Sequence, residues 1–186
     1  MKIQTRPLKK GFTLAEVLVT IAIIAIMAAV LLPALNNQLS KGDTSRTSSD
    51  LTNIQSGIQA FVSDMRRYPA TTTQLINPLP TGASSTDISL VAYSASDSAA
   101  WKGPYMSRDV LSNTGGRAAI ATSFGTVTQS STKFLSVNLS PVTQTQYENL
   151  EFALDEGTTS TTSTTLGQIR YSSSNKVLTF LAMPIQ

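Results

Sequence analysis

A single carboxylate stands within the longest apolar stretch of the sequence. Between Phe12 and Leu35 the polar side chains are Thr13, Glu16 and Thr20, and Glu16 carries the only charge of the stretch. A carboxylate in lipid is costly unless it is hydrated at the membrane interface or paired with a cation. Glu16 is therefore either a hydrated residue at headgroup depth or a residue with an ionic partner.

The amino-acid composition excludes the catalytic and redox chemistry that depends on cysteine or histidine. The chain has no cysteine and no histidine, so it offers no disulfide, no thiolate nucleophile and no catalytic triad with a histidine base. Asp155 and Glu156 are adjacent carboxylates that could give oxygen ligands to a cation, but such pairs are more often found in a solvated turn. We predict no enzymatic activity, no cofactor and no metal site.

The apolar stretch around Glu16 is long enough to cross a membrane. As a helix, 12–35 would reach about 36 Å, against about 30 Å for a hydrocarbon core. Pro33, near its end, lacks an amide donor and is predicted to kink the helix. Four basic residues precede the stretch, and the next one is Lys41. This asymmetry predicts a cytoplasmic N-terminal flank and an exported C-terminal body.

The residues at the start of the stretch resemble a known processing signal. The sequence Lys9-Lys10-Gly11-Phe12-Thr13-Leu14-Ala15-Glu16 is similar to the cleavage and methylation signal of type IV prepilins and type II secretion pseudopilins, the class III signal peptide. The resemblance implies that a prepilin peptidase cuts after Gly11 and that Phe12 becomes N-methylated. It also implies that Glu16 pairs with the N-terminal amine of a neighbouring subunit during filament assembly.

Two other kinds of N-terminal segment are also apolar. A secretory signal peptide has an apolar region of about 7–15 residues followed by a small-residue cleavage site. The stretch 12–35 is longer, contains Glu16 and ends in Leu-Leu-Pro-Ala-Leu, so it does not fit. A plain signal anchor on an unrelated exported domain remains the alternative.

The basic character of the chain lies in its first residues. The formal net charge is +3, from 14 basic and 11 acidic residues. Residues 1–11 hold four of the basic ones and no acidic one, so their removal leaves ten basic and 11 acidic residues, a net charge of −1. Overall charge therefore gives no reason to expect a nucleic-acid partner.

A second helical pattern follows the apolar stretch. Apolar residues recur at helical spacing on one face: Leu51, Ile54, Ile58, Phe61, Val62 and Met65. The helix should end near Tyr68, because Pro69 disfavours helical geometry in the residue before it. Residues 40–45 are poor helix formers, so the long helix is expected to be weakened around Pro33 and Gly42.

The remainder predicts a small mixed head. Residues 70–100 read as a long connection with one short helical turn at 74–76, and Trp101-Lys102-Gly103-Pro104-Tyr105 as a buried aromatic corner. That segment resembles one in the heads of major pseudopilins and related pilins. Strands are expected at 118–127 and 133–139. A helix should follow at about 141–155, with Ser140 as N-cap and Pro141 at its first position. The chain should then form an exposed Ser/Thr loop at 158–165 and a hairpin at 168–171 and 176–181.

Together these features predict a leader at 1–11, a long helix at 12–68 with 12–35 transmembrane, and an α+β head at 69–186 with a small antiparallel sheet. By the resemblance, the chain is a structural pilin that passes from the inner membrane into a type IV pilus-like filament. Its partners would be identical subunits, the prepilin peptidase and the inner-membrane assembly machinery. The alternatives are a type II secretion pseudopilin, and a competence pilin that binds DNA through Arg66, Arg67, Lys102 and Arg108.

Overall fold

The structure is a computed structural model, which describes residues 11–111, 118–155 and 167–185. The chain divides into two compact units, residues 1–40 and 41–186. The first unit is helical from Leu14 onward, and its helix continues through Pro33. The same helix, α1 (Leu14–Met65), runs into the second unit. It is the one helix in the described ranges that is long and apolar enough to cross a membrane by length and composition.

The second half of α1 supplies one side of the head core. The predicted apolar stripe is confirmed: Leu51, Ile54, Ile58 and Phe61 are fully buried, and Met65 nearly so. They join one cluster with the inward-facing residues of the sheet. Gly57 allows close packing, since a Cβ there would lie 3.0 Å from the carbonyl oxygen of Tyr105.

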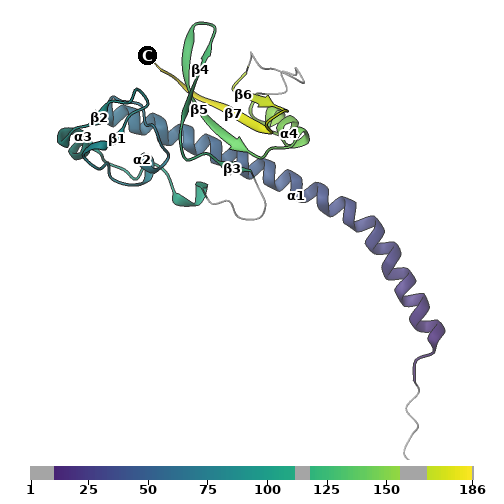
Figure 1. Cartoon of the computed structure of the whole chain (residues 1–186). Helices are drawn as coiled ribbons and strands as arrows, with labels where there is room; N and C mark the ends of the chain where they lie inside the picture. The colour runs from purple at the N-terminus through teal and green to yellow at the C-terminus, as the bar shows by residue number, and fades with distance from the viewer. Residues whose placement is uncertain (1–10, 112–117, 156–166, 186) are drawn as a thin grey trace, which may run out of the picture. The chain divides into compact units, whose positions relative to one another are not determined.

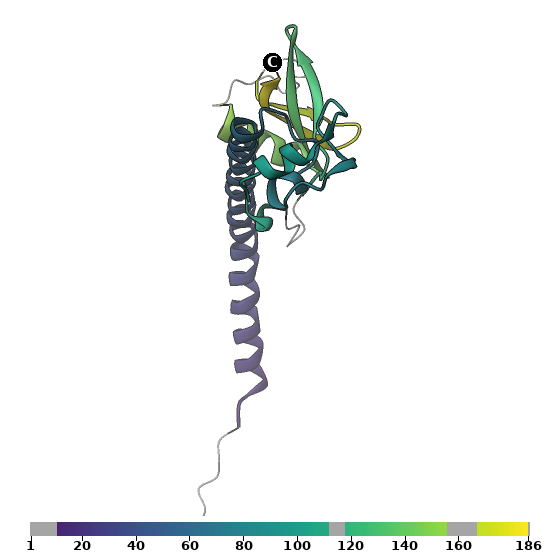
Figure 2. The same cartoon turned by 90° about the vertical axis from the view of Figure 1, so that its left-hand side faces the viewer.

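The head is built on a five-stranded antiparallel sheet. The order is β3-β5-β7-β6, and β4 also pairs with β5. The strands are β3 (Ala119–Ile120), β4 (Gly125–Gln129), β5 (Thr132–Ser140), β6 (Ile169–Ser172) and β7 (Val177–Ile185). Figure 1 shows them beside the second half of α1, and Figure 2 shows that they lie to one side of that helix. The fold class is therefore α+β, as predicted.

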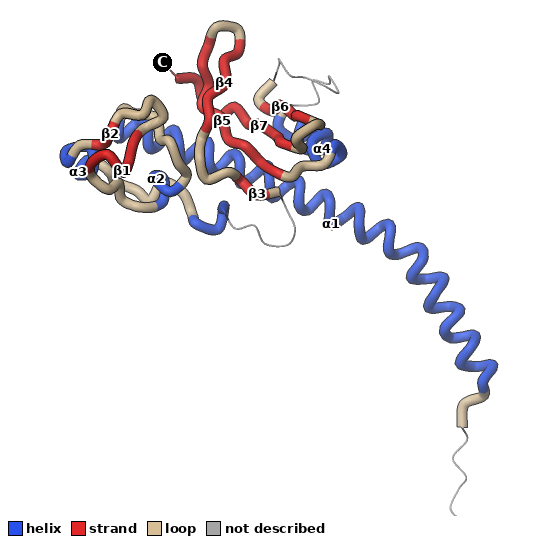
Figure 3. The backbone as a smooth tube through the Cα atoms, in the orientation of Figure 1, coloured by secondary structure: helices blue, strands red, loops and turns tan. Residues whose placement is uncertain are grey.

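Short elements complete the head. Between α1 and the sheet come α2 (Thr73–Ile76), β1 (Gly82–Thr86), β2 (Ala92–Tyr93), α3 (Ala95–Ala100) and the 3-10 turn η1 (Arg108–Leu111). Helix α4 (Gln144–Leu154) lies between β5 and β6 and buries Tyr147 and Leu150. Figure 3 separates these helices from the strands by colour.

The aromatic corner is confirmed as a structural feature. The Trp101 indole Nε1 donates to the Gln74 carbonyl at 2.9 Å, and the Tyr105 ring meets both Trp101 and Phe61 edge-on. The Tyr105 hydroxyl donates to Asp64 at 3.1 Å. The corner therefore ties the connection after α3 to the last turns of α1.

An ionic cluster holds the turn between β1 and β2. The Arg67 guanidinium donates to Asp87 at 2.8 Å and to Asp97 at 2.9 Å, and it lies 4.6 Å from the centre of the Tyr93 ring. Burial tends to lower the pKa of Arg67, but Asp87 and Asp97 outweigh this effect and raise it. The end of α1 is thus joined to the β1–β2 turn and to α3.

Several predicted boundaries were wrong for local reasons. Helix α1 is continuous through 40–45, in agreement with the prediction of one long helix, and the Thr47 hydroxyl donates to the Asp43 carbonyl at 2.8 Å. It ends at Met65 rather than near Tyr68, because Arg66 adopts a positive φ of 55°. The expected connection 70–100 contains β1, β2 and α3 besides the predicted turn α2.

The head elements also differ from expectation in detail. The strand expected at 118–127 is two strands, β3 and β4, that both pair with β5. Ser140 closes β5 rather than capping α4. The N-cap of α4 is Thr143, whose side chain and that of Gln146 form a capping box. The hairpin β6–β7 is confirmed, whereas 158–165 lies outside the described residues.

Candidate assembly site at the N-terminus

The Glu16 carboxylate caps the start of its own helix. The backbone N–H of Thr13 donates to Glu16 Oε2 at 2.8 Å, and the Thr13 hydroxyl donates to the same oxygen at 2.9 Å. In return the Glu16 N–H donates to Thr13 Oγ1 at 3.2 Å. With Leu14 as the first helical residue, Thr13 and Glu16 form a reciprocal capping box.

This arrangement gives Glu16 a local electrostatic role. A carboxylate in the first turn faces the positive end of the helix dipole and satisfies an N–H that has no partner within the helix. Sequence reasoning missed Thr13, although the pattern Thr-x-x-Glu before an apolar run is a recognised capping signal. Within the described residues, Thr13 is the hydrogen-bond partner of this carboxylate.

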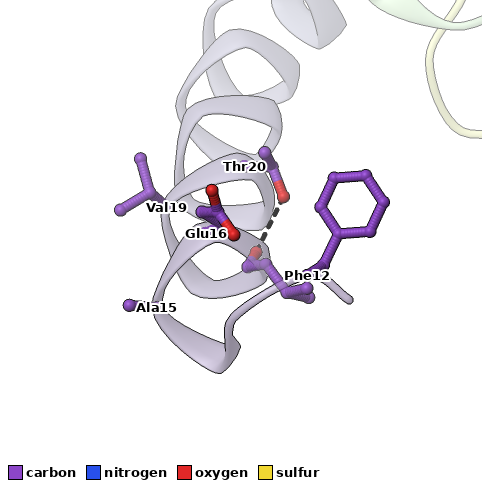
Figure 4. Close-up of a pocket in the computed structure, with 6 residues that line it drawn as sticks. Phe12, Ala15, Glu16, Val19 and Thr20 are labelled. Carbon is purple, nitrogen blue, oxygen red and sulfur yellow. Dashed lines mark hydrogen bonds between the residues drawn. The ribbon is translucent and has the colours of Figure 1, made fainter. Parts of the chain in front are cut away.

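The residues of the expected cleavage point precede the helix. Gly11 and Phe12 are exposed and lie outside regular secondary structure. Figure 4 shows the Phe12 ring beside the first turns of the helix, with Glu16 and Thr20 on the neighbouring turns. The Thr20 hydroxyl donates to the Val17 carbonyl at 2.8 Å, so it too is satisfied within the helix.

Among the described residues of the first unit, the large apolar side chains of the helix are exposed. Phe12 is 90% exposed, and the large apolar residues from Leu14 to Leu35 are all at least half exposed. Monomeric soluble proteins rarely expose a continuous apolar surface of this extent. The surface therefore requires lipid or other protein around it.

Most of the basic residues considered for DNA binding have partners within the head. Arg67 is held by Asp87 and Asp97, Lys102 lies 3.8 Å from Asp64, and Arg108 donates to Asn77 at 2.7 Å. Three of the four basic residues considered for DNA binding thus have partners within the head. No group of three metal-binding side chains occurs in the described part of the chain.

Comparison with known proteins identifies the N-terminal segment. Residues 6–32 match the family model for the prokaryotic N-terminal methylation motif. The chain thus carries the signal of a prepilin-like protein at the place where the capping box and the exposed apolar helix lie. The predicted resemblance to type IV prepilins and type II secretion pseudopilins is confirmed over this segment.

The relatives come from both groups. The type II secretion system core protein G of Pectobacterium carotovorum subsp. carotovorum is 33% identical over 63 residues, which is 34% of this chain and 40% of that protein. That of Aeromonas hydrophila is 36% identical over 63 residues, 34% and 44% of the two chains. The type IV major alpha-pilin of Moraxella bovis is 44% identical over 52 residues, 28% and 33%.

These similarities cover only part of each protein. The chain spans less than half the length of the relatives it matches, and no solved structure matches it significantly. The pilin and pseudopilin resemblance is therefore carried by the methylation motif, the partial relatives and the observed helix-plus-sheet fold.

Proposed function

We propose that this chain is a structural subunit of a type IV pilus-like filament. Residues 1–11 are removed after Gly11, Phe12 becomes the methylated N-terminus, and the chain polymerises through its N-terminal helix. Glu16 then pairs with the N-terminal amine of a neighbouring subunit. The chain has no catalytic role in this proposal.

The uncovered apolar helix carries the proposal. Residues 6–32 match the methylation motif, and the large apolar side chains from Leu14 to Leu35 are exposed. Lipid would surround these apolar side chains before assembly, and the helices of identical subunits would surround them in the filament. The subunit would be inserted in the inner membrane as a single-pass precursor before it assembles into the filament. Its partners would be the prepilin peptidase and the inner-membrane assembly machinery.

The capping box is compatible with an assembly role for Glu16. Thr13 occupies one carboxylate oxygen, Oε2, and a carboxylate has further lone pairs available for a cation. Pairing between subunits would add a partner to Glu16 and need not break the cap.

A pseudopilin of a type II secretion system is the second candidate. The core protein G relatives favour it, whereas the Trp101–Tyr105 corner resembles a segment found in both pseudopilins and related pilins. The pilus is preferred because the head is long and because residues 158–165 consist of serine and threonine alone, which suits an exposed filament surface. A DNA-binding competence pilin is less well supported, since Arg67, Lys102 and Arg108 already have partners.

Imaging of sheared surface filaments, with mass spectrometry of their main subunit, tests the proposal. We expect filaments whose main subunit begins at an N-methylated Phe12 and retains the whole head. A mature chain that begins at Met1, or beyond Ala28, would exclude the processing step. A correctly processed chain that remains in the envelope without surface filaments would favour the pseudopilin.

A further inference from the structure

The outer edge of β4 is the least protected edge of the main sheet. Strand β4 pairs with β5 from Gly125 opposite Ser136 to Gln129 opposite Thr132. No other strand of the described residues pairs with its second side. Figures 1 and 3 show the β4–β5 hairpin projecting from the rest of the sheet.

Other edges of this sheet carry protection that β4 lacks. The end of β7 contains Pro184, and the short strand β6 carries Arg170. The segment before β4 is covered, because the Phe124 N–H donates to the Ala70 carbonyl at 2.9 Å. Proline, charge and covering segments are the usual means of preventing edge-to-edge pairing. Strand β4 instead reads Gly-Thr-Val-Thr-Gln, with no charge and no proline.

The hairpin turn determines which backbone groups face outward. Ser130 and Ser131 have φ values of 46° and 69°, as in the two-residue turns that match strand twist. The flanking pair Gln129 and Thr132 then exchanges backbone hydrogen bonds, and bonding alternates along the strand. The N–H and C=O groups of Thr126 and Thr128 therefore point to the open side.

We propose that two copies of this chain pair through their β4 edges, antiparallel and centred on Val127. In this register Thr126 of each copy lies opposite Thr128 of the other. Each of these two pairs exchanges both of its backbone hydrogen bonds, so every outward-pointing group of the two threonines is satisfied. This two-fold register also places like side chains opposite each other, threonine opposite threonine and Val127 opposite Val127, which are favourable cross-strand pairs.

The side chains support the same register. Val127 lies opposite Phe134 on β5, and Phe134 lies opposite Pro184 on β7, which forms an apolar row across one face of the sheet. Val127 and Phe134 are only half-buried. Pairing brings the two Val127 side chains together and extends the row into the second copy. Threonine pairs on the other face are also favourable across antiparallel strands.

This contact has a defined consequence for assembly. A two-fold contact closes on itself and cannot propagate a filament. It joins heads laterally, so in a filament it would connect subunits of two neighbouring filaments. One short strand pair is weak, but many pairs in parallel become strong through multivalency. The inference requires only two copies of the chain and does not depend on the proposed function.

Cysteine cross-linking of the full chain in detergent micelles tests the pairing. The chain has no cysteine, so Val127→Cys introduces a single thiol. Val127 would face its counterpart as a non-hydrogen-bonded pair, where Cβ atoms are close enough for a disulfide. Ser131→Cys, at the exposed hairpin turn, is the matched control for random collision. We expect Val127→Cys to give covalent dimer about tenfold faster than this control.

Further variants test the register. Thr128→Pro removes an outward N–H without removing a bond to β5, so adding it to Val127→Cys should reduce dimer formation to the control rate. A mixture of Thr126→Cys and Thr128→Cys chains should form mixed dimers faster than either chain alone forms its own dimer, which tests the pairing even if Val127→Cys does not fold. Equal rates for Val127→Cys and Ser131→Cys, or no preference in the mixture, would overturn the proposal.

Discussion

The part of α1 in the first unit, 14–40, and the part in the second unit, 41–65, differ in the exposure of their apolar side chains. Both halves are apolar on a helical scaffold, but the large apolar side chains of the second half are buried in the head, whereas those of the first half are exposed. The second half reads as an amphipathic stripe and the first as apolar on every side. An apolar stripe indicates a helix that packs on the core of its own chain. A helix that is apolar on every side must be surrounded by lipid or by other protein.

Matched truncations in the two halves should give the largest difference. Ile58 is fully buried in the core and Ile24 is 64% exposed. We expect Ile58→Ala to lower the free energy of unfolding of the head by about 2–5 kcal/mol, because it leaves a cavity, and Ile24→Ala to leave it unchanged. Chemical denaturation of the full chain in micelles, followed by fluorescence of Trp101, measures both. Equal losses would show that the halves are not independent.

Removing Arg67 should be the next largest effect. Its side chain is 19% exposed and joins Asp87 and Asp97, so Arg67→Ala leaves two carboxylates without their cation. We expect a loss of about 2–3 kcal/mol in the same unfolding measurement. Arg108→Ala is the control: Arg108 is exposed and donates to Asn77, and its removal should cost at most about 0.5 kcal/mol. Similar losses of unfolding free energy for the two variants would show that the ionic cluster does not stabilise the head.

Two glycines should respond with opposite signs. A Cβ at Gly103 would overlap the Trp101 ring, whereas a Cβ at Gly42 meets nothing within 4 Å. Gly103→Ala should therefore lower the stability of the head by about 1–3 kcal/mol and shift the emission of Trp101. Gly42→Ala, within α1, should raise helix stability by about 1 kcal/mol. A destabilising Gly42→Ala would indicate a contact at the start of the second half.

Acid should weaken the head slightly through Asp97. Hydrogen bonds from the backbone and side chain of Ser94, together with Arg67, lower the pKa of Asp97 below its ordinary value of 3.8. The stabilisation is therefore complete above that value and is lost as the pH falls through the lower pKa of the folded state. Unfolding curves of the wild type and Asp97→Asn should converge as the pH is lowered below 4. A constant difference between them would contradict this assignment.

The sequence predicted the long-range pattern better than the local detail. The stripe from Leu51 to Met65 and the hairpin β6–β7 followed directly from periodicity. Ser140 was misassigned because Ser-Pro resembles a helix start, while Thr143 with Gln146 forms the stronger capping box. Strands β1 and β2 were missed because they are short and their pairing is set by Asp87, which holds the turn through the N–H groups of Ser89 and Val91.

In the candidate site, too, the sequence motif was predicted and the local hydrogen bonding was not. Gly11, Phe12 and Glu16 could be proposed from the motif alone, because their types and spacing are unusual. The bond from Thr13 to Glu16 was missed because the apolar run alone does not show where the helix begins; the Thr-x-x-Glu pattern would have shown it. The cap matters for experiment, because Glu16→Ala removes both the charge and the cap.

Filament yield from Glu16→Gln tests the central claim most directly. Glutamine can keep the capping box but not the charge, and Thr13→Ala removes the cap's hydroxyl while keeping the charge. If Glu16 pairs with the amine of Phe12 on a neighbouring subunit, Glu16→Gln should abolish or sharply reduce filaments while membrane levels of processed chain stay normal, since an unpaired buried amine is costly. Thr13→Ala should then be milder. Normal filaments from Glu16→Gln, with loss in Thr13→Ala, would contradict the account and leave Glu16 as a helix cap.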